Sequence, residues 1–171
     1  DSCSSNGVLG EIRKLPADET TPCNPTNVYE KTKLLGEQAA LAFARATGFE
    51  VVVARPAWVY GPRCPRTAQL LRMVGRGRFL MFGDGSTLRH PIYVEDAVRG
   101  LELCADCGTP GAVYFLAGEK AVSIAALVQT MAEAQAVRLK IVHLPVLLGI
   151  TAGLIFTWLL LPVVYEDTSP G

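Results

Sequence analysis

The decisive stretch of this chain is NPTNVYEKTK, residues 24–33, in which Tyr29 and Lys33 stand four positions apart. On a helix, residues at this spacing share a face, so the phenol and the ammonium can reach the same site. A free phenol is a poor base at neutral pH, and a nearby cation favours its phenolate form. The pair alone is a weak motif, because an amphipathic helix with a half-buried tyrosine and a snorkelling lysine carries the same residues.

Three further stretches make this weak motif specific, because each stands at a defined distance from Tyr29 and Lys33 in the sequence. They are SSNGVLG (4–10), RPAWVYGP (55–62) and GDGSTLRHPIYVED (83–96). In order and spacing, the four stretches resemble the extended short-chain dehydrogenase/reductases, the NAD-dependent epimerase/dehydratase group. The resemblance runs from about Ser4 to about Val128.

This resemblance implies an α/β fold in two parts. Residues 1–62 would be the C-terminal part of a Rossmann-like doubly wound parallel sheet. Residues 63–171 would mix the edge of that sheet with a small, incomplete substrate-binding lobe, which carries an apolar segment at 144–164. A homodimer is left open.

The resemblance also assigns roles to individual residues. Ser5 would hydrogen-bond the substrate oxygen, with Asn6 beside it at the substrate. Tyr29 would be the acid/base, and Lys33 would hold the nicotinamide ribose. Arg89 would contact a substrate diphosphate, a task that suits a planar guanidinium. The backbone of one loop would approach the carboxamide of the NAD or NADP cofactor; its residues are Pro56, Ala57, Trp58 and Val59.

The reaction expected from these residues is oxidoreduction at a secondary alcohol. Sugar-nucleotide 4,6-dehydratases carry Asp-Glu directly after the catalytic hydroxyl residue, whereas this chain has Asn6-Gly7, which disfavours dehydration. We expect an epimerase or dehydrogenase that acts on a nucleotide sugar, and a 3β-hydroxysteroid dehydrogenase-like enzyme is the alternative. An alternative from another class is a noncatalytic NAD-sensing or membrane-tethered relative, or a nonfunctional fragment.

One expected motif is missing from the sequence. Dinucleotide-binding folds place a Gly-rich turn between a strand and a helix, where it receives the pyrophosphate. Neither Gly75-Arg76-Gly77 nor Gly83-Asp84-Gly85 has that context. We therefore expect the sequence to be a fragment that lacks about a hundred N-terminal residues of the cofactor half.

The amino-acid composition argues against a nucleic-acid partner and favours one type of cellular compartment. The 16 basic and 16 acidic residues balance, so no nucleic-acid partner is indicated. The five cysteines are an odd number, which favours a reducing, cytoplasmic compartment over a disulfide framework. No metal site is expected, since Cys104-Ala105-Asp106-Cys107 has no second ligand pair at a fitting spacing.

The hydrophobic pattern predicts alternating strands and helices. Helices are expected at about 26–47, 67–75, 96–105 and 123–136, with Asp96 and Ser123 as N-caps, and strands at about 3–5, 51–54, 79–82, 113–116 and 140–142.

The apolar segment 144–164 contains no charged residue and is long enough to cross a bilayer core of ~30 Å. Pro145 and Pro162 shorten its uninterrupted helix, so we favour a helix packed in the lobe, with membrane contact left open.

Overall fold

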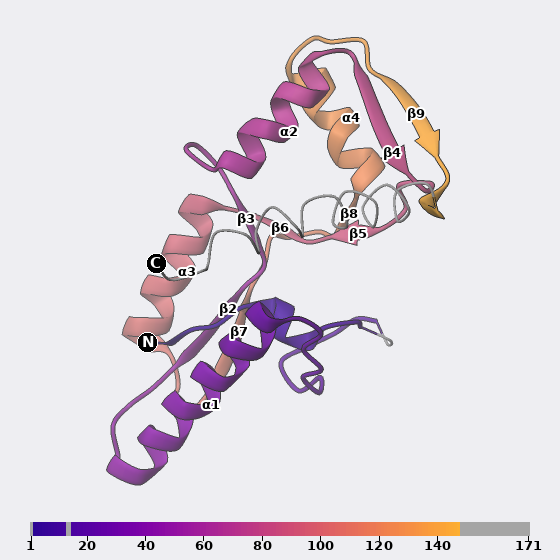
Figure 1. Ribbon diagram of the computed structural model, residues 1–171. Coiled ribbons are helices and arrows are strands. Elements are labelled where there is room, and N and C mark those ends of the chain that lie inside the picture. The colour runs from indigo at the N-terminus through magenta and orange to yellow at the C-terminus, as the bar shows by residue number, and fades with distance from the viewer. Residues whose placement is uncertain (1, 13–14, 148–171) are drawn as a thin grey trace, which may run out of the picture. The chain divides into compact units, whose positions relative to one another are not determined.

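The computed structural model describes residues 2–12 and 15–147 (Figure 1). By its internal contacts the chain forms two units. The first is Asp1–Thr67 with Arg89–Val122, and the second is Ala68–Leu88 with Ser123–Gly171. The α/β class is confirmed, and the strand pairs whose register is given below are all parallel. The functional boundary expected after residue 62 stays a prediction.

The first unit is built on a three-stranded parallel sheet in the order β1-β2-β7. Its strands are β1 (Ser2–Cys3), β2 (Val53–Pro56) and β7 (Val113–Leu116). In register, Cys3 pairs with Ala54, and Ala54 pairs with Tyr114. A separate parallel pair joins β3 (Trp58–Tyr60) to β6 (Pro91–Tyr93), and β5 (Leu88–Arg89) pairs with β8 (Val122–Ser123).

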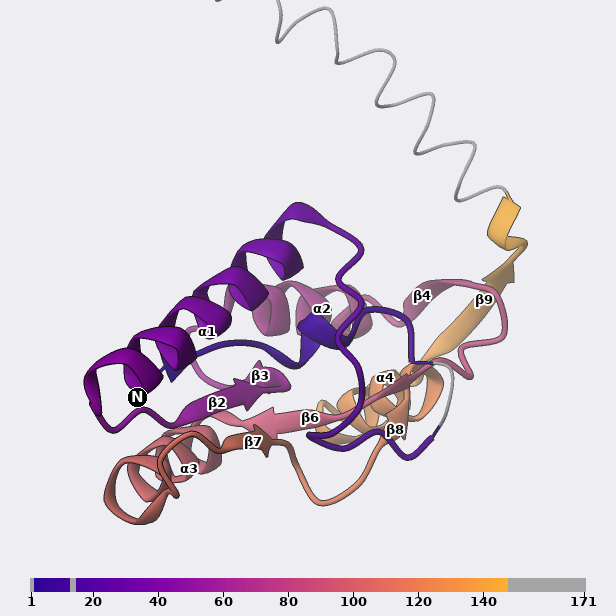
Figure 2. The same ribbon diagram turned by 90° about the horizontal axis from the view of Figure 1, so that it is seen from below.

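Helices lie on both faces of the three-stranded sheet, α1 (Val28–Thr47) on one side and α3 (Val94–Cys107) on the other (Figure 2). Side chains alternate between the two faces of a strand. On one face, Val52 and Ala54 pack against Cys104 of α3. On the other face, Arg55 reaches Glu37 of α1. This layering is the doubly wound arrangement expected from the sequence.

The ends of α1 follow from its sequence. Asn27 is the N-cap, and its side chain accepts a hydrogen bond from the backbone N–H of Glu30 at 3.0 Å. At the other end, Gly48 adopts the left-handed conformation with φ of 73°, which glycine enters without a Cβ clash. The expected helix at 26–47 is therefore confirmed to within two residues at its start.

The start of α3 differs from the expectation, because its N-cap is Tyr93 rather than Asp96. Tyr93 supplies no side-chain capping bond, and Asp96 lies inside the first turn of the helix. The expectation was wrong because β6 runs directly into α3 and leaves no loop in which an aspartate could cap. Asp96 still suits its place, since a negative charge near a helix N-terminus is stabilising.

The second unit pairs β4 (Arg78–Phe82) with β9 (Lys140–Leu144) in parallel. Helices α2 (Pro65–Gly75) and α4 (Ile124–Ala134) contribute to one core with β4 (Figure 1). Ser123 caps α4 as expected, with its Oγ accepting from the N–H of Ala126 at 3.1 Å. The buried residues of this core are Val74, Phe79, Met81, Val128 and Ala132.

Within the described ranges, 2–12 and 15–147, we find no helix with the length and apolar character needed to span a bilayer. Most of the apolar segment at 144–164 lies outside the described residues, which end at Leu147. Its expected packing in the lobe stays a prediction.

Candidate active site

Ser5 is held by the short 3-10 helix η1 (Asn6–Leu9) that follows β1. Its backbone is extended, and its Oγ accepts a hydrogen bond from the N–H of Gly7 at 3.1 Å. A hydroxyl that accepts through a lone pair keeps its own hydrogen for donation. Ser5 is half-buried and can therefore donate to an oxygen outside the protein. Asn6, beside it, is exposed.

The segment that leads into α1 folds back onto η1. The N–H of Asn24 donates to the carbonyl oxygen of Val8 at 3.0 Å. Gly10 ends η1 with φ of 61°, and a Cβ at this position would collide with the Asn24 carbonyl. Only glycine fits both the backbone conformation and the close approach. The start of α1 is thereby fixed relative to Ser5.

A capping box orients the first turn of α1, where Tyr29 is the second helical residue. The Glu30 carboxylate accepts from the N–H of Thr26 at 2.7 Å, from its hydroxyl at 2.9 Å and from the N–H of Asn27 at 3.4 Å. These bonds, above all the one from the Thr26 amide, lower the pKa of Glu30. The charged form of Glu30 therefore holds the turn that carries Tyr29.

Lys33 joins Tyr29 to the strand that precedes Ser5. Its Nζ lies 6.0 Å from the centre of the Tyr29 ring and donates to the carbonyl oxygen of Cys3 at 3.1 Å. Tyr29 itself is 59% exposed. The structure thus places the expected Tyr29–Lys33 pair on one helix face, and Lys33 contacts the chain segment that ends in Ser5.

Two charged residues near this site were not predicted from the sequence. Arg55 donates to the Glu37 carboxylate through Nη2 at 2.6 Å and through Nε at 3.0 Å, and each residue is only 4% exposed. Burial opposes the charge of Arg55, but the hydrogen bonds and charge of Glu37 outweigh it and raise the pKa of Arg55. A signal was available, since Arg55 directly follows the buried run 51–54 and needs an anionic partner there.

The segment expected as a loop at the nicotinamide, 56–59, is mostly strand. Pro56 ends β2, Trp58 and Val59 begin β3, and only Ala57 lies between the two strands, because Pro56 pairs with β7 and Trp58 with β6. All four residues are half-buried. The N–H of Ala57 donates to the carbonyl oxygen of Leu116 in β7 at 2.8 Å. This bond ties the segment to the sheet edge where the parallel strands end, the place at which open α/β sheets bind ligands.

Arg89 stands apart from this group, because it lies in β5 rather than in the sheet β1-β2-β7. Its side chain is exposed. Its expected contact with a diphosphate stays a prediction, as do the roles of Ser5, Tyr29 and Lys33.

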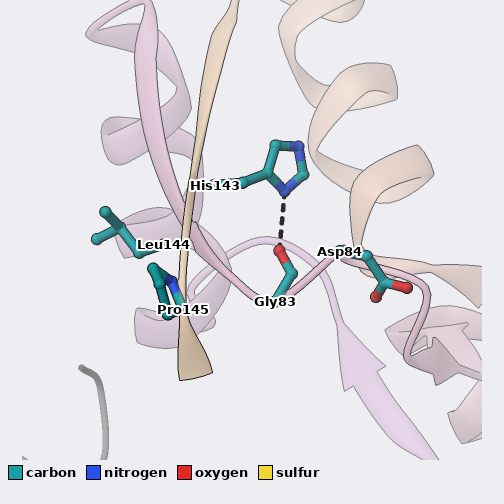
Figure 3. Close-up of a pocket in the computed structure, with 5 residues that line it drawn as sticks. All are labelled: Gly83, Asp84, His143, Leu144 and Pro145. Atoms are coloured by element: carbon teal, nitrogen blue, oxygen red, sulfur yellow. Dashed lines mark hydrogen bonds between the residues drawn. The ribbon is translucent and has the colours of Figure 1, made fainter. Parts of the chain in front are cut away.

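The second unit has a hollow of about 560 Å³ that contains none of the expected site residues (Figure 3). Within it, the His143 ring points at the carbonyl of Gly83, with Nδ1 2.8 Å from the oxygen. A carbonyl can only accept, so Nδ1 carries the proton of this bond. Asp84 turns to its own loop instead, where the hydroxyl and N–H of Ser86 lower the pKa of its carboxyl.

Comparison with known protein families shows to which family the chain belongs. The sequence model of the NAD dependent epimerase/dehydratase family matches residues 2–117. The chain belongs to this family. The match covers every residue of the candidate site described above, from Ser5 to Arg89.

Individual relatives are similar over part of their length. A dTDP-glucose 4,6-dehydratase of Streptomyces griseus is 34% identical over 137 residues, which are 77% of this chain and 41% of the relative. The RMD structure from Pseudomonas aeruginosa complexed with NADPH has a TM-score of 0.76 and 27% identity, covering 82% of this chain and 51% of that one. The UDP-glucose 4-epimerase of Thermotoga maritima with UDP-glucose has a TM-score of 0.74 and 27% identity, covering 84% and 49%.

The comparisons thus establish family and fold. The chain spans about half the length of these relatives, or less. Similar structures contain NAD or NADPH, and some contain nucleotide sugars.

Proposed function

We propose that this chain supplies the acid/base part of an NAD(P)-dependent enzyme that oxidises or epimerises a secondary alcohol of a nucleotide sugar. The observation that carries the proposal is the position of Lys33, whose Nζ lies near the Tyr29 ring and is bonded to the Cys3 carbonyl, two residues before Ser5. This contact supports a single site that would use the Tyr29 phenol, the Lys33 ammonium and the Ser5 hydroxyl.

The donor groups of this site fit a nicotinamide cofactor. An ammonium has three donors, and the bond to Cys3 uses one of them, so Lys33 keeps two for ribose hydroxyls. The half-buried backbone of Pro56 to Val59 would hold the carboxamide at the end of the sheet. The bound cofactor would supply or accept the hydride.

The chain's own residues would manage the proton. Ser5 would donate its free hydroxyl hydrogen to the substrate oxygen and so hold it. Tyr29 would take the alcohol proton as the hydride leaves and return it in the reverse step. Correctly placed acid/base groups contribute roughly 10²–10⁴-fold to such a step.

The same site argues for oxidation or epimerisation rather than dehydration. Elimination of water needs an additional acid and base, and neither Asn6 nor Gly7 can serve. Gly7 packs closely against this site, since a Cβ there would lie 3.3 Å from both Glu30 Cγ and Ser5 Oγ.

Tyr29→Phe in the full-length protein tests the proposal. Turnover with NAD and UDP-glucose or dTDP-glucose should fall by about two orders of magnitude, since only the proton-transfer group is removed. Cofactor affinity, measured by calorimetric titration, should change little. Near-native turnover in this variant would make the acid/base assignment untenable, and a neutral steroid alcohol as the better substrate would favour the 3β-hydroxysteroid dehydrogenase-like alternative.

A further inference from the structure

The Glu37–Arg55 pair is unusual for its burial. Its two hydrogen bonds, 2.6 and 3.0 Å long, form a bidentate fork between residues that are each 4% exposed. The pair Lys120–Glu119, in contrast, is exposed and 3.8 Å apart. Taking two charges out of water is expensive, and apolar side chains of the same volume often hold a structure as well or better. The pair therefore needs an explanation other than stability.

The position of the Glu37–Arg55 pair in the fold suggests what the pair does. Glu37 follows Tyr29 and Lys33 at intervals of four, so all three point from the same side of α1. Arg55 is the residue of β2 directly before Pro56, where the expected cofactor loop begins. The pair thus joins the helix that carries Tyr29 and Lys33 to the strand that leads into the expected cofactor segment 56–59.

The strand also reaches the third component of the site. Ala54, next to Arg55 in β2, accepts a hydrogen bond from the N–H of Ser4 at 2.8 Å, and Ser4 directly precedes Ser5. A movement of α1 relative to β2 would consequently change the distance from Tyr29 and Lys33 to Ser5.

The guanidinium itself is held on several sides. Its Nη2 lies 3.3 Å from the thiol of Cys23, in the loop that leads into α1. Its carbon lies 5.8 Å from the centre of the Phe115 ring in β7. Nη1 is buried and has no hydrogen-bond partner among the described residues. The direction of the guanidinium is thus fixed by its neighbours, and the fork transmits that direction to Glu37.

We propose that Glu37 and Arg55 are positioning residues, which set the rotation and depth of α1 so that Tyr29 and Lys33 meet the substrate beside Ser5. This inference rests on the proposed function. An apolar contact in the same place would attach the helix to the sheet without fixing its direction, since burial of apolar surface is non-directional. Proton transfer depends on direction, because misplacement by about 1 Å can lower a rate about 10²-fold.

The test replaces the fork without leaving a buried charge. In the full-length protein, the double variant Glu37→Leu/Arg55→Met keeps the volume and removes both charges. We expect it to remain folded, with turnover per cofactor-binding site about 10²-fold lower and cofactor affinity several-fold weaker, because Tyr29 and Lys33 move together. Arg45→Met, at an exposed position on the same helix, is the control and should leave both values unchanged.

A conservative variant separates positioning from general stability. Glu37→Gln keeps the side-chain shape and one acceptor for Arg55 but loses one charge-assisted bond of the fork, so its turnover should be lower than that of the wild type by up to about tenfold, a smaller loss than in the double variant. It also provides a folded sample if the double variant does not fold, and wild-type turnover in Glu37→Gln would then overturn the proposal. Wild-type turnover in a folded double variant would overturn it directly.

One measurement keeps this inference separate from the proposed function. If Tyr29→Phe is fully active, the proposed function is wrong, and amide hydrogen exchange over residues 28–33 then tests the pair alone. Exchange at least tenfold faster in the double variant than in the wild type and in Arg45→Met would support positioning of the helix start. Equal exchange would reject it.

Discussion

Replacement of Gly10 by alanine tests the junction between η1 and the start of α1. The residue has φ of 61° and ψ of −134°, and an alanine Cβ would lie 2.8 Å from the carbonyl carbon of Asn24, closer than real Cβ contacts allow. The obstacle is backbone, so no side chain can rotate away. Either Gly10 must change its conformation, or the Asn24 segment must move off η1.

Both responses lower the free energy of unfolding. A residue with a Cβ in such a backbone conformation costs of order 1–3 kcal/mol. Displacement of Asn24 also removes its 3.0 Å bond to Val8, and one such bond is worth about 0.5–1.5 kcal/mol. If the alanine keeps the backbone conformation and Asn24 moves away, both terms apply, and urea denaturation should show a loss of about 1.5–4.5 kcal/mol.

Gly36→Ala is a matched control, since the same substitution at that position should raise the free energy of unfolding instead of lowering it. Gly36 lies inside α1, is exposed, and has nothing within 4 Å of an added Cβ. Alanine should stabilise this helix by about 0.5–1 kcal/mol, because glycine loses more backbone entropy. If Gly10→Ala were as stable as the wild type while Gly36→Ala behaved as expected, the close approach of Asn24 to η1 would be refuted.

Three further predictions concern ligands and pH. Arg89→Ala should raise the KM for UDP-glucose at least tenfold, through the loss of one charge-assisted bond, and leave the KM for a neutral steroid alcohol unchanged. If the wild type and the variant had the same KM for every nucleotide sugar, the diphosphate role would be contradicted. The 171-residue chain should show no micromolar affinity for NAD or NADP in calorimetric titration, because its sequence contains no Gly-rich pyrophosphate turn. The hydrogen bonds from Thr26 lower the pKa of Glu30 from its ordinary 4.5. The stability that the charged Glu30 contributes is therefore complete above pH 4.5 and disappears as the pH falls through the lower pKa of the folded state. Glu30→Gln should therefore reduce the loss of stability in acid relative to the wild type, as measured by urea denaturation at pH 7 and at pH 3.

The regular elements were largely predictable from local sequence. The strand at 113–116 and the helix end at Thr47 lie where the pattern placed them, because a run of apolar residues with two aromatic side chains and a glycine stop are local signals. The short strands β3, β5, β6 and β8 have two or three residues each, too few for a period to appear. Asp96 was misjudged as a cap for a related reason, since its surroundings depend on where β6 ends.

The sequence by itself determined the family and supplied the residues of the candidate site, whose roles stay a prediction, because Tyr29 and Lys33 are four residues apart on one helix and the flanking motifs are contiguous stretches. Only the tertiary structure decided what holds that helix in place. Glu37 and Arg55 are 18 positions apart, and Cys23 and Arg55 are 32 apart. Such contacts depend on how a strand and a helix pack, so no local pattern specifies them. A buried charge indicates that a partner exists, and the folded chain alone shows which residue it is.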